Sequence, residues 1–265
     1  MATGDPEQNH TPETLLAAGE RLLAEGRKLF NSLAGAAHYT TAMRPDGTCP
    51  IFYQDDVYYI CLPFGDFDRY QMHMVARRTP HDPQLLVQLF DLLPDLKGKA
   101  FLDVGSFTGS FAMVVRGMLT PAETHLFEPQ KTMHDAIQIT ISANGAEKDT
   151  TFHPDIIDDG TETMLMGTYR PHLLSETPYL RRADSKLQSK SIDALKIEKV
   201  GLINLHFHNS KMYALAGAKK TIERDLPFIT TDLHGRDLKE MRELLNPLGY
   251  EEVGASQHTM IFVPK

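Results

Sequence analysis

Hydrophobic positions from residue 83 to the end of the chain alternate between two patterns. Short apolar runs, typical of buried strands, are separated by stretches with apolar residues at helical spacing. The runs predict strands at 100–104, 124–128, 150–153, 202–207 and 228–233, and the helical spacing predicts helices at 83–93, 110–119, 133–143, 213–224 and 237–245. Such alternation predicts parallel βαβ units with right-handed crossovers. A last pair of strands, 250–254 and 259–263, has no helix between its members and predicts one antiparallel strand at the end of the sheet.

The first part of the chain has a different pattern. Residues 11–35 carry leucines at helical spacing, and 51–53 with 57–62 read as a β-hairpin around a turn at 54–56. We therefore expect an extension at 1–78, made of a helix and a hairpin, before the main domain at 79–265. The apolar face of the helix would pack on its own domain, over the active site, or on a second subunit as a homodimer. A stretch at 157–190 reads as rich in loops.

Composition and charge narrow the classes of partner. A formal net charge of −8 argues against sequence-independent binding to phosphate backbones, so we expect no nucleic-acid partner. The longest apolar runs are of strand length, and we expect no membrane contact. The first residues lack the basic and apolar regions of a signal peptide, and only Cys49 and Cys61 are present, which together favour a cytoplasmic location.

A turn rich in glycine and serine follows the first strand of the main domain. Asp103 is the last residue but one of this strand, and the turn includes Gly105, Ser106, Phe107 and Gly109 before a helix starts. Glycines allow the backbone to approach a ligand, and the start of a helix offers unpaired N–H groups. The spacing Asp-x-Gly-x-x-x-Gly lacks the glycine pair of dinucleotide-binding proteins. It therefore favours a nucleoside ligand without a pyrophosphate.

Two further acidic positions complete the predicted cofactor site. Glu128, followed by Pro129, ends the next strand about 20 residues beyond the glycine turn, where a carboxylate can accept both hydroxyls of a ribose. Asp155 and Ile156 come just after the third strand, and could accept from an adenine amino group and pack on its ring. The nearby Asp158 and Asp159 are alternatives for the acidic role.

Taken together, these motifs resemble the FkbM-type methyltransferases, a branch of the class I S-adenosylmethionine-dependent enzymes. The resemblance extends over about residues 80–265 and is carried by segments 102–109, 127–130, 144–145, 191–195, 215–218, 227–235 and 248–250. It implies an α/β fold with a class I methyltransferase Rossmann-like sheet of seven strands, the last one antiparallel. It also implies S-adenosyl-L-methionine at the carboxyl edge, and O-methylation of a sugar, a polyketide or another small metabolite.

The chain departs from this family at one segment. The family pattern Ile-Asp-Val-Glu-Gly-x-Glu is replaced here by the residues from Leu205 to Lys211. His206 stands in place of the aspartate, His208 in place of the first glutamate, and Lys211 in place of the second. Any role that the family gives to those acids cannot be carried over to this chain.

The histidines are the candidate catalytic residues. His206 and His208 lie at the carboxyl end of one strand, and Asp232 and His234 lie at the end of the next. The four side chains should therefore meet at the carboxyl edge of the sheet. In one reading a histidine, His206 by preference, is the general base for a substrate hydroxyl. In another, His206, His208, Asp232 and His234 bind a divalent metal that orients the substrate. In a third, they make structural or substrate hydrogen bonds, and catalysis depends on proximity.

The sequence therefore predicts an S-adenosylmethionine-dependent methyltransferase that acts on the hydroxyl of a small-molecule or glycan acceptor. Two alternatives remain open beside an ordinary base mechanism: metal-assisted O-methylation through the His/Asp group, and a catalytically weakened relative that only binds the cofactor or a metabolite. A nicotinamide oxidoreductase is disfavoured by the missing glycine pair.

Overall fold

The computed structural model describes most of the chain from the hairpin onward. The described residues are 44, 47–62, 74–161, 163–167, 179–182, 187–207, 211–232, 237–254 and 259–265. The helix predicted at 11–35 lies outside these residues, as do His208 and His234. Within them, no helix combines the length and apolar character that crossing a membrane would need.

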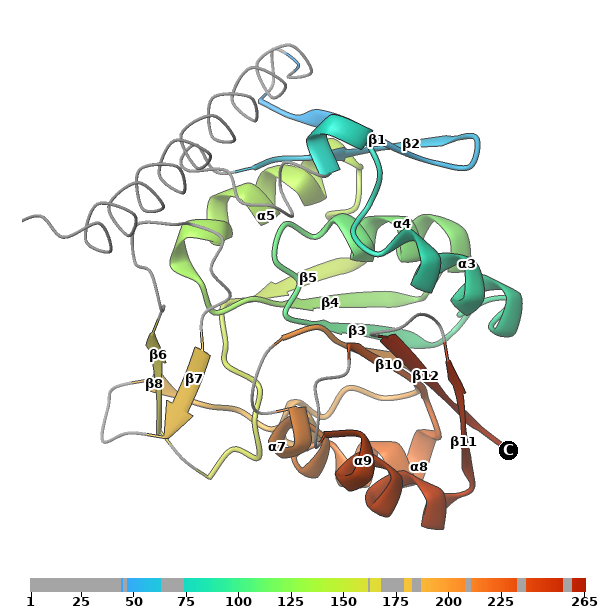
Figure 1. Ribbon diagram of the computed structural model, residues 1–265. Coiled ribbons are helices and arrows are strands. Elements are labelled where there is room, and N and C mark those ends of the chain that lie inside the picture. The colour runs from blue at the N-terminus through green and yellow to red at the C-terminus, as the bar shows by residue number, and fades with distance from the viewer. Residues whose placement is uncertain are drawn as a thin grey trace, which may run out of the picture.

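A seven-stranded mixed sheet forms the centre of the molecule (Figure 1). From one edge to the other its strands are β5 (Thr150–His153), β4 (Glu123–Phe127), β3 (Ala100–Val104), β9 (Val200–Leu205), β10 (Phe228–Asp232), β12 (Thr259–Pro264) and β11 (Tyr250–Gly254). The pairings from β5 to β10 are parallel, whereas β12 runs antiparallel to both β10 and β11. The predicted seven-stranded sheet with its reversed last strand is confirmed.

Helices cover both faces of the sheet (Figure 1). One face carries α3 (Pro83–Leu92), α4 (Ser110–Leu119) and α5 (Lys131–Ala143), and the other carries α7 (Lys211–Ala216), α8 (Lys219–Asp225) and α9 (Asp237–Leu245). Each face has its own apolar core, because side chains alternate along every strand. Phe101 packs in the core beneath α3 to α5, whereas Leu102 and Val104 pack in the other.

The predicted hairpin is confirmed and lies on the outer side of the α4–α5 layer (Figure 1). It consists of β1 (Cys49–Tyr53) and β2 (Asp56–Ile60). Asn144, which caps the end of α5, accepts a hydrogen bond from Tyr59 N and donates one to Tyr59 O, at 3.0 and 2.6 Å. Thr140 Oγ1 accepts from Cys61 N at 2.9 Å. These contacts attach the hairpin to the main domain.

Two predictions about the second half of the chain are wrong. The helix expected at 213–224 is two helices, α7 and α8, which are separated at Gly217 and Ala218. A Cβ atom on Gly217 would lie 2.1 Å from Asp158 O, so a neighbouring segment passes directly against the break. The stretch predicted to be rich in loops contains a small antiparallel sheet of β6 (Thr163–Gly167), β7 (Tyr179–Arg182) and β8 (Leu187–Gln188).

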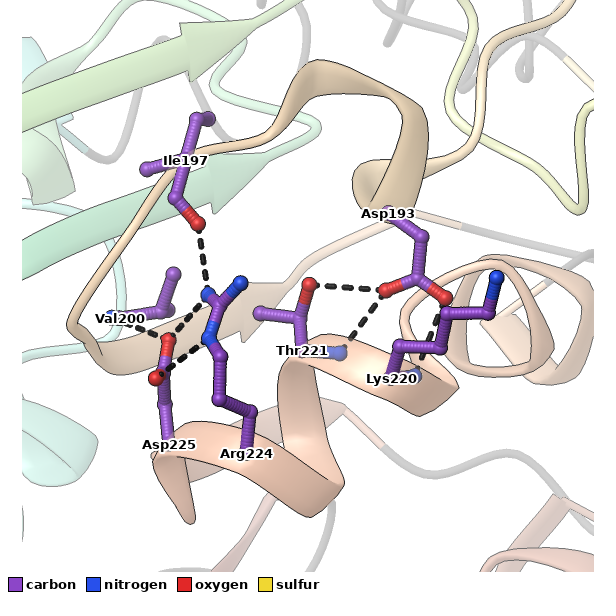
Figure 2. A network of polar contacts seen from close by, with 7 residues as sticks. All are labelled: Asp193, Ile197, Val200, Lys220, Thr221, Arg224 and Asp225. Carbon is purple, nitrogen blue, oxygen red and sulfur yellow. Dashed lines mark hydrogen bonds and ion pairs between the residues drawn. The ribbon is translucent and has the colours of Figure 1, made fainter.

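A polar network explains why a second helix starts after the break (Figure 2). Asp193, in α6 (Ile192–Leu195), accepts hydrogen bonds from Lys220 N, Thr221 N and Thr221 Oγ1, at 3.0, 2.9 and 2.8 Å. It thus replaces the capping side chain that Ala218 lacks at the start of α8. At the other end of α8, Asp225 accepts from Val200 N at 2.8 Å and joins the helix to β9.

Candidate active site

The glycine turn lies at the carboxyl end of β3, against the end of β9. Gly105 has φ 85°, and a Cβ atom there would lie 2.4 Å from His206 O. The absence of a side chain is therefore required by the approach of these two segments. Gly109, at φ 75°, precedes the first turn of α4, where it caps the helix without a side-chain hydrogen bond. The predicted sequence of strand, glycine turn and helix is confirmed.

Ser106 and Phe107 join the turn to the neighbouring strand β4. Ser106 Oγ donates to Asp103 O at 2.7 Å and accepts from Phe127 N at 3.1 Å. The backbone N–H groups of Gly105 and Ser106 both donate to Phe127 O. Phe107 has a left-handed backbone conformation, with φ 51°, and its N–H donates to Glu128 Oε2. The conformation of the turn is thus fixed by its neighbours before any ligand binds.

Glu128 is buried directly beside the turn, with 3% of its surface exposed. Its Oε2 accepts from Phe107 N at 3.0 Å, and its Oε1 accepts from Gln130 N at 2.9 Å. Burial raises the pKa of Glu128 to about 7, with a smaller contribution from the charge of Asp103. The side chain of Gln130 also donates to this carboxylate. A carboxylate has about four acceptor sites, so a ligand that displaces the Gln130 side chain can donate to both oxygens.

Asp103 is buried at the end of β3, and its two oxygens have different surroundings. Oδ1 accepts from Asn204 Nδ2 at 2.7 Å, whereas Oδ2 has no hydrogen-bond partner among the described residues. Burial raises the pKa of Asp103 to about 6, and the hydrogen bond from Asn204 opposes this rise. A buried carboxylate oxygen without a partner is energetically unfavourable unless a ligand donates to it.

The other predicted cofactor residues lie along the ends of β4 and β5. Pro129 is half-buried and follows Glu128 directly. Ile156 is buried, and its carbonyl oxygen accepts from Lys190 N at 2.9 Å. The Asp155 carboxylate forms an ion pair with Lys190 Nζ at 2.9 Å through Oδ2. Asp155 and Ile156 follow β5, as predicted. Their proposed contact with an adenine ring stays a prediction.

His206 lies at the carboxyl end of β9, where its N–H donates to Val104 O of β3 at 2.9 Å. Its ring meets the ring of His81 edge to face, with the centroids 4.5 Å apart and the planes at 86°. Burial lowers the pKa of His81 to about 3, and His206 contributes to the shift. His81 is therefore uncharged at neutral pH, so it does not compete with its neighbour for a proton.

Asp232 ends β10, which is the parallel neighbour of β9 as predicted. Its Oδ1 forms an ion pair at 2.6 Å with Lys211 Nζ, and Lys211 also donates to the carbonyl oxygen of Asp232. Lys211 has only 2% of its surface exposed. Lys211 thus neutralises an acid of the predicted cluster.

The metal reading gains no support from the described residues. Among them, no three His, Cys, Asp or Glu side chains lie close enough to hold a metal ion. Two of the four predicted ligands, His208 and His234, lie outside this part of the chain. The carboxylate of Asp232 already forms an ion pair with the ammonium group of Lys211.

Sequence reasoning missed three polar residues of the site. His81 is far from His206 in the chain, and its segment before α3 carries no motif. Asn204 lies within a strand that reads as apolar. In the sequence, Lys211 stands only as the loss of an acid, and nothing there indicates its ion pair with Asp232. Spacing alone could have placed only Asn204, because the parallel register aligns it with Asp103.

Comparisons with known proteins find likeness in structure alone. No protein-family model matches the chain, and no curated protein sequence matches it. Among solved structures, the methyltransferase FkbM of Methylobacillus flagellatus is similar at 14% identity, with 74% of this chain and 55% of that chain covered and a TM-score of 0.47. This chain thus spans little more than half the length of that protein.

Two other solved structures are also similar. A SAM-dependent O-methyltransferase of Thermotoga maritima matches at 13% identity, covering 83% of this chain and 79% of that one, with a TM-score of 0.46. The precorrin-6y C5,15-methyltransferase of Geobacter metallireducens matches at 9% identity, covering 68% and 85%, with a TM-score of 0.44. At such low identity, the function has to be argued from the residues of this chain.

Proposed function

We propose that this protein is an S-adenosylmethionine-dependent methyltransferase that methylates a hydroxyl group of a small acceptor, with His206 as general base. The observation that supports this best is the arrangement of Glu128. Two backbone N–H groups orient its buried carboxylate at the carboxyl edge of the sheet, beside the glycine turn. In open α/β sheets this edge is where nucleoside ligands bind.

The residues present suit S-adenosylmethionine in charge and in hydrogen bonding. Glu128 would accept from both ribose hydroxyls through its remaining lone pairs. Asp103 Oδ2, which has no partner among the described residues, would accept from the cofactor's α-ammonium group. Ile156 and Asp155 would contact the adenine. When bound, the cofactor supplies a methyl group activated by its positive sulfur.

His206 would take the proton of the acceptor hydroxyl as the oxygen bonds to the methyl carbon and the carbon–sulfur bond breaks. His81 is uncharged and packs against the ring of the base, which holds that ring in place. Orientation of the two reactants would supply much of the remaining rate.

The proposal is tested by transfer of a labelled methyl group from S-adenosylmethionine to a panel of hydroxylated sugars and metabolites. For the best acceptor, we expect His206→Asn to lower kcat by about 100-fold or more, which is typical of losing a general base. Binding of S-adenosylhomocysteine should change little. The control is His125→Asn, in the middle of β4. Strand alternation places His125 on the same face as Phe127, which packs in the core beneath α7 to α9, away from His206 and His81.

Full turnover in His206→Asn would contradict the role of His206 as base. Binding of the cofactor without transfer to any acceptor of the panel would favour the alternative of a protein that binds the cofactor or a metabolite. Absence of binding would contradict the proposed function itself.

A further inference from the structure

A chain of side-chain hydrogen bonds crosses three neighbouring strands behind the candidate cofactor site. Thr230 Oγ1 of β10 donates to Asn204 Oδ1 of β9 at 2.7 Å. Asn204 Nδ2 donates in turn to Asp103 Oδ1 of β3 at 2.7 Å. The parallel register places Asn204 opposite both partners. All three side chains are buried, with 0%, 1% and 1% of their surfaces exposed.

The chain of hydrogen bonds has a fixed direction whenever Asp103 is ionised. A carboxylate only accepts hydrogen bonds, so the amide of Asn204 must turn its NH₂ group toward it. The amide oxygen then faces Thr230, and this hydroxyl has to donate. Thr230 therefore keeps the amide in the one orientation that serves the charged form of Asp103.

The chain of hydrogen bonds ends at a buried carboxylate that has one unpaired oxygen among the described residues. Asn204 occupies Asp103 Oδ1, which leaves Oδ2 without a partner among the described residues. Two other ionisable groups act on this carboxyl group. His206 favours its charged form, whereas the charges of Asp103 and Glu128 repel each other. The donated hydrogen bond from Asn204 acts in the same direction as His206 and opposes the effect of burial on the pKa of Asp103.

We propose that Asn204 and Thr230 are positioning residues that keep Asp103 ionised and direct its Oδ2 toward the α-ammonium group of the cofactor. The inference rests on the proposed function, since it requires a cofactor with an amino-acid end. A buried residue of β10, two strands away from the glycine turn, would thus influence how the amino-acid end of the cofactor is recognised.

The test compares two probes that differ in the amino-acid end. S-adenosylhomocysteine carries the α-ammonium group, whereas 5′-methylthioadenosine has the same nucleoside and lacks it. Both are titrated calorimetrically into the wild type, Thr230→Val and Thr230→Ser at pH 7.5. Valine keeps the volume of threonine and removes the hydroxyl, and serine keeps the hydroxyl.

We expect Thr230→Val to bind S-adenosylhomocysteine about tenfold more weakly, as for the loss of a hydrogen bond that supports a charged group. Binding of 5′-methylthioadenosine should stay within about twofold, and Thr230→Ser should restore the wild-type affinity for both. As the pH is lowered, the affinity for S-adenosylhomocysteine should begin to fall at a higher pH in Thr230→Val than in the wild type. The reason is that Asp103 protonates more readily once the amide of Asn204 is free to turn.

Equal weakening of both probes, or no weakening of either, would overturn the inference. Asn204→Ala, assayed in the same way, covers the case in which Thr230→Val does not fold. It removes the donor to Asp103 directly and should give the same selective loss. A wild type that binds neither probe would contradict the proposed function, which separates the two failures.

Discussion

At the scale of single residues, the candidate site contains two buried carboxyl groups that titrate near neutrality. Burial raises the pKa of Glu128 to about 7 and that of Asp103 to about 6. Part of the ligand-free protein therefore carries a proton on Glu128 at neutral pH. A ligand that donates hydrogen bonds to these oxygens favours their ionised forms, so its binding should release protons.

The raised pKa of Glu128 predicts how stability depends on pH. The folded protein binds this proton more tightly than the unfolded chain does, so the contribution to stability is present below the ordinary pKa and is lost as pH rises through about 7. As the pH rises from about 4.5 to about 8, the free energy of unfolding of the wild type should fall by up to about 3 kcal/mol relative to that of Glu128→Gln. Urea unfolding of both proteins across this range measures the difference. A difference that does not change with pH would contradict the assigned cause.

The two acids were predicted from the sequence because each ends a strand at the spacing of a nucleoside site. His81 was not, because its contact with His206 exists only after the segment before α3 has packed over the sheet. The buried pair of Lys211 and Asp232 was missed for a related reason, since a lysine after a histidine-rich segment reads as exposed. Motif spacing identifies residues at strand ends, whereas tertiary packing adds their partners.

At the scale of elements, α8 depends on a cap that comes from another helix. Asp193 accepts three hydrogen bonds at the start of α8 (Figure 2). Asp193→Ala should lower the free energy of unfolding by about 1–2 kcal/mol, the range for losing a capping side chain. Glu223→Ala is the control: its exposed i,i+4 ion pair with Lys219 should contribute less than about 0.5 kcal/mol. Equal effects in denaturant unfolding would show that Asp193 does not act as a cap.

The hairpin β1–β2 depends on Asn144 in a comparable way. Asn144→Ala removes the acceptor and the donor that satisfy the backbone of Tyr59. We expect faster amide exchange along β2 and a loss of about 1–3 kcal/mol in stability. Ser142→Ala, which removes only an exposed hydrogen bond to Glu147, serves as the control. Unchanged exchange at Tyr59 and Cys61 would mean that other contacts hold the hairpin.

Hydrophobic periodicity predicted the strands and helices of the main domain to within a few residues. It failed for α7 and α8, where the apolar spacing continues through Gly217. What breaks the helix is the approach of the segment at Asp158 and the cap from Asp193, and both come from distant parts of the chain. The strands of the small sheet β6–β8 were also missed, because their sequences lack a clear alternation.

At the scale of the whole molecule, the order of the strands brings the candidate residues together. In sequence order, β3 is the first strand of the seven-stranded sheet. The next two strands, β4 and β5, lie on one side of it and the later strands lie on the other, so β3 lies between β4 and β9. Open α/β sheets bind ligands at such a point, where the strand order reverses. The carboxyl end of β3 bears Asp103 and the glycine turn, with Glu128 after β4 and His206 after β9.

A ligand held by three separate segments should stabilise the whole domain. S-adenosylhomocysteine at about 100 times its Kd should raise the Tm by several degrees, since binding at that ratio adds about 2.7 kcal/mol to the folded state. Thermal unfolding with increasing ligand measures this. Adenosine diphosphate is the control nucleotide, because its pyrophosphate does not suit a turn without the glycine pair. Equal stabilisation by both would contradict a site made for the methyl donor.

The most direct test of the central claim is calorimetric titration of S-adenosylhomocysteine into the wild type and Glu128→Gln between pH 6 and pH 8. We predict saturable binding of one ligand by the wild type, with an affinity that rises with pH as Glu128 ionises. In Glu128→Gln we predict at least a tenfold loss of affinity at pH 8 and a weaker dependence on pH. A wild type that does not bind, or a variant that binds as the wild type does, would contradict a methyl-donor site built on Glu128.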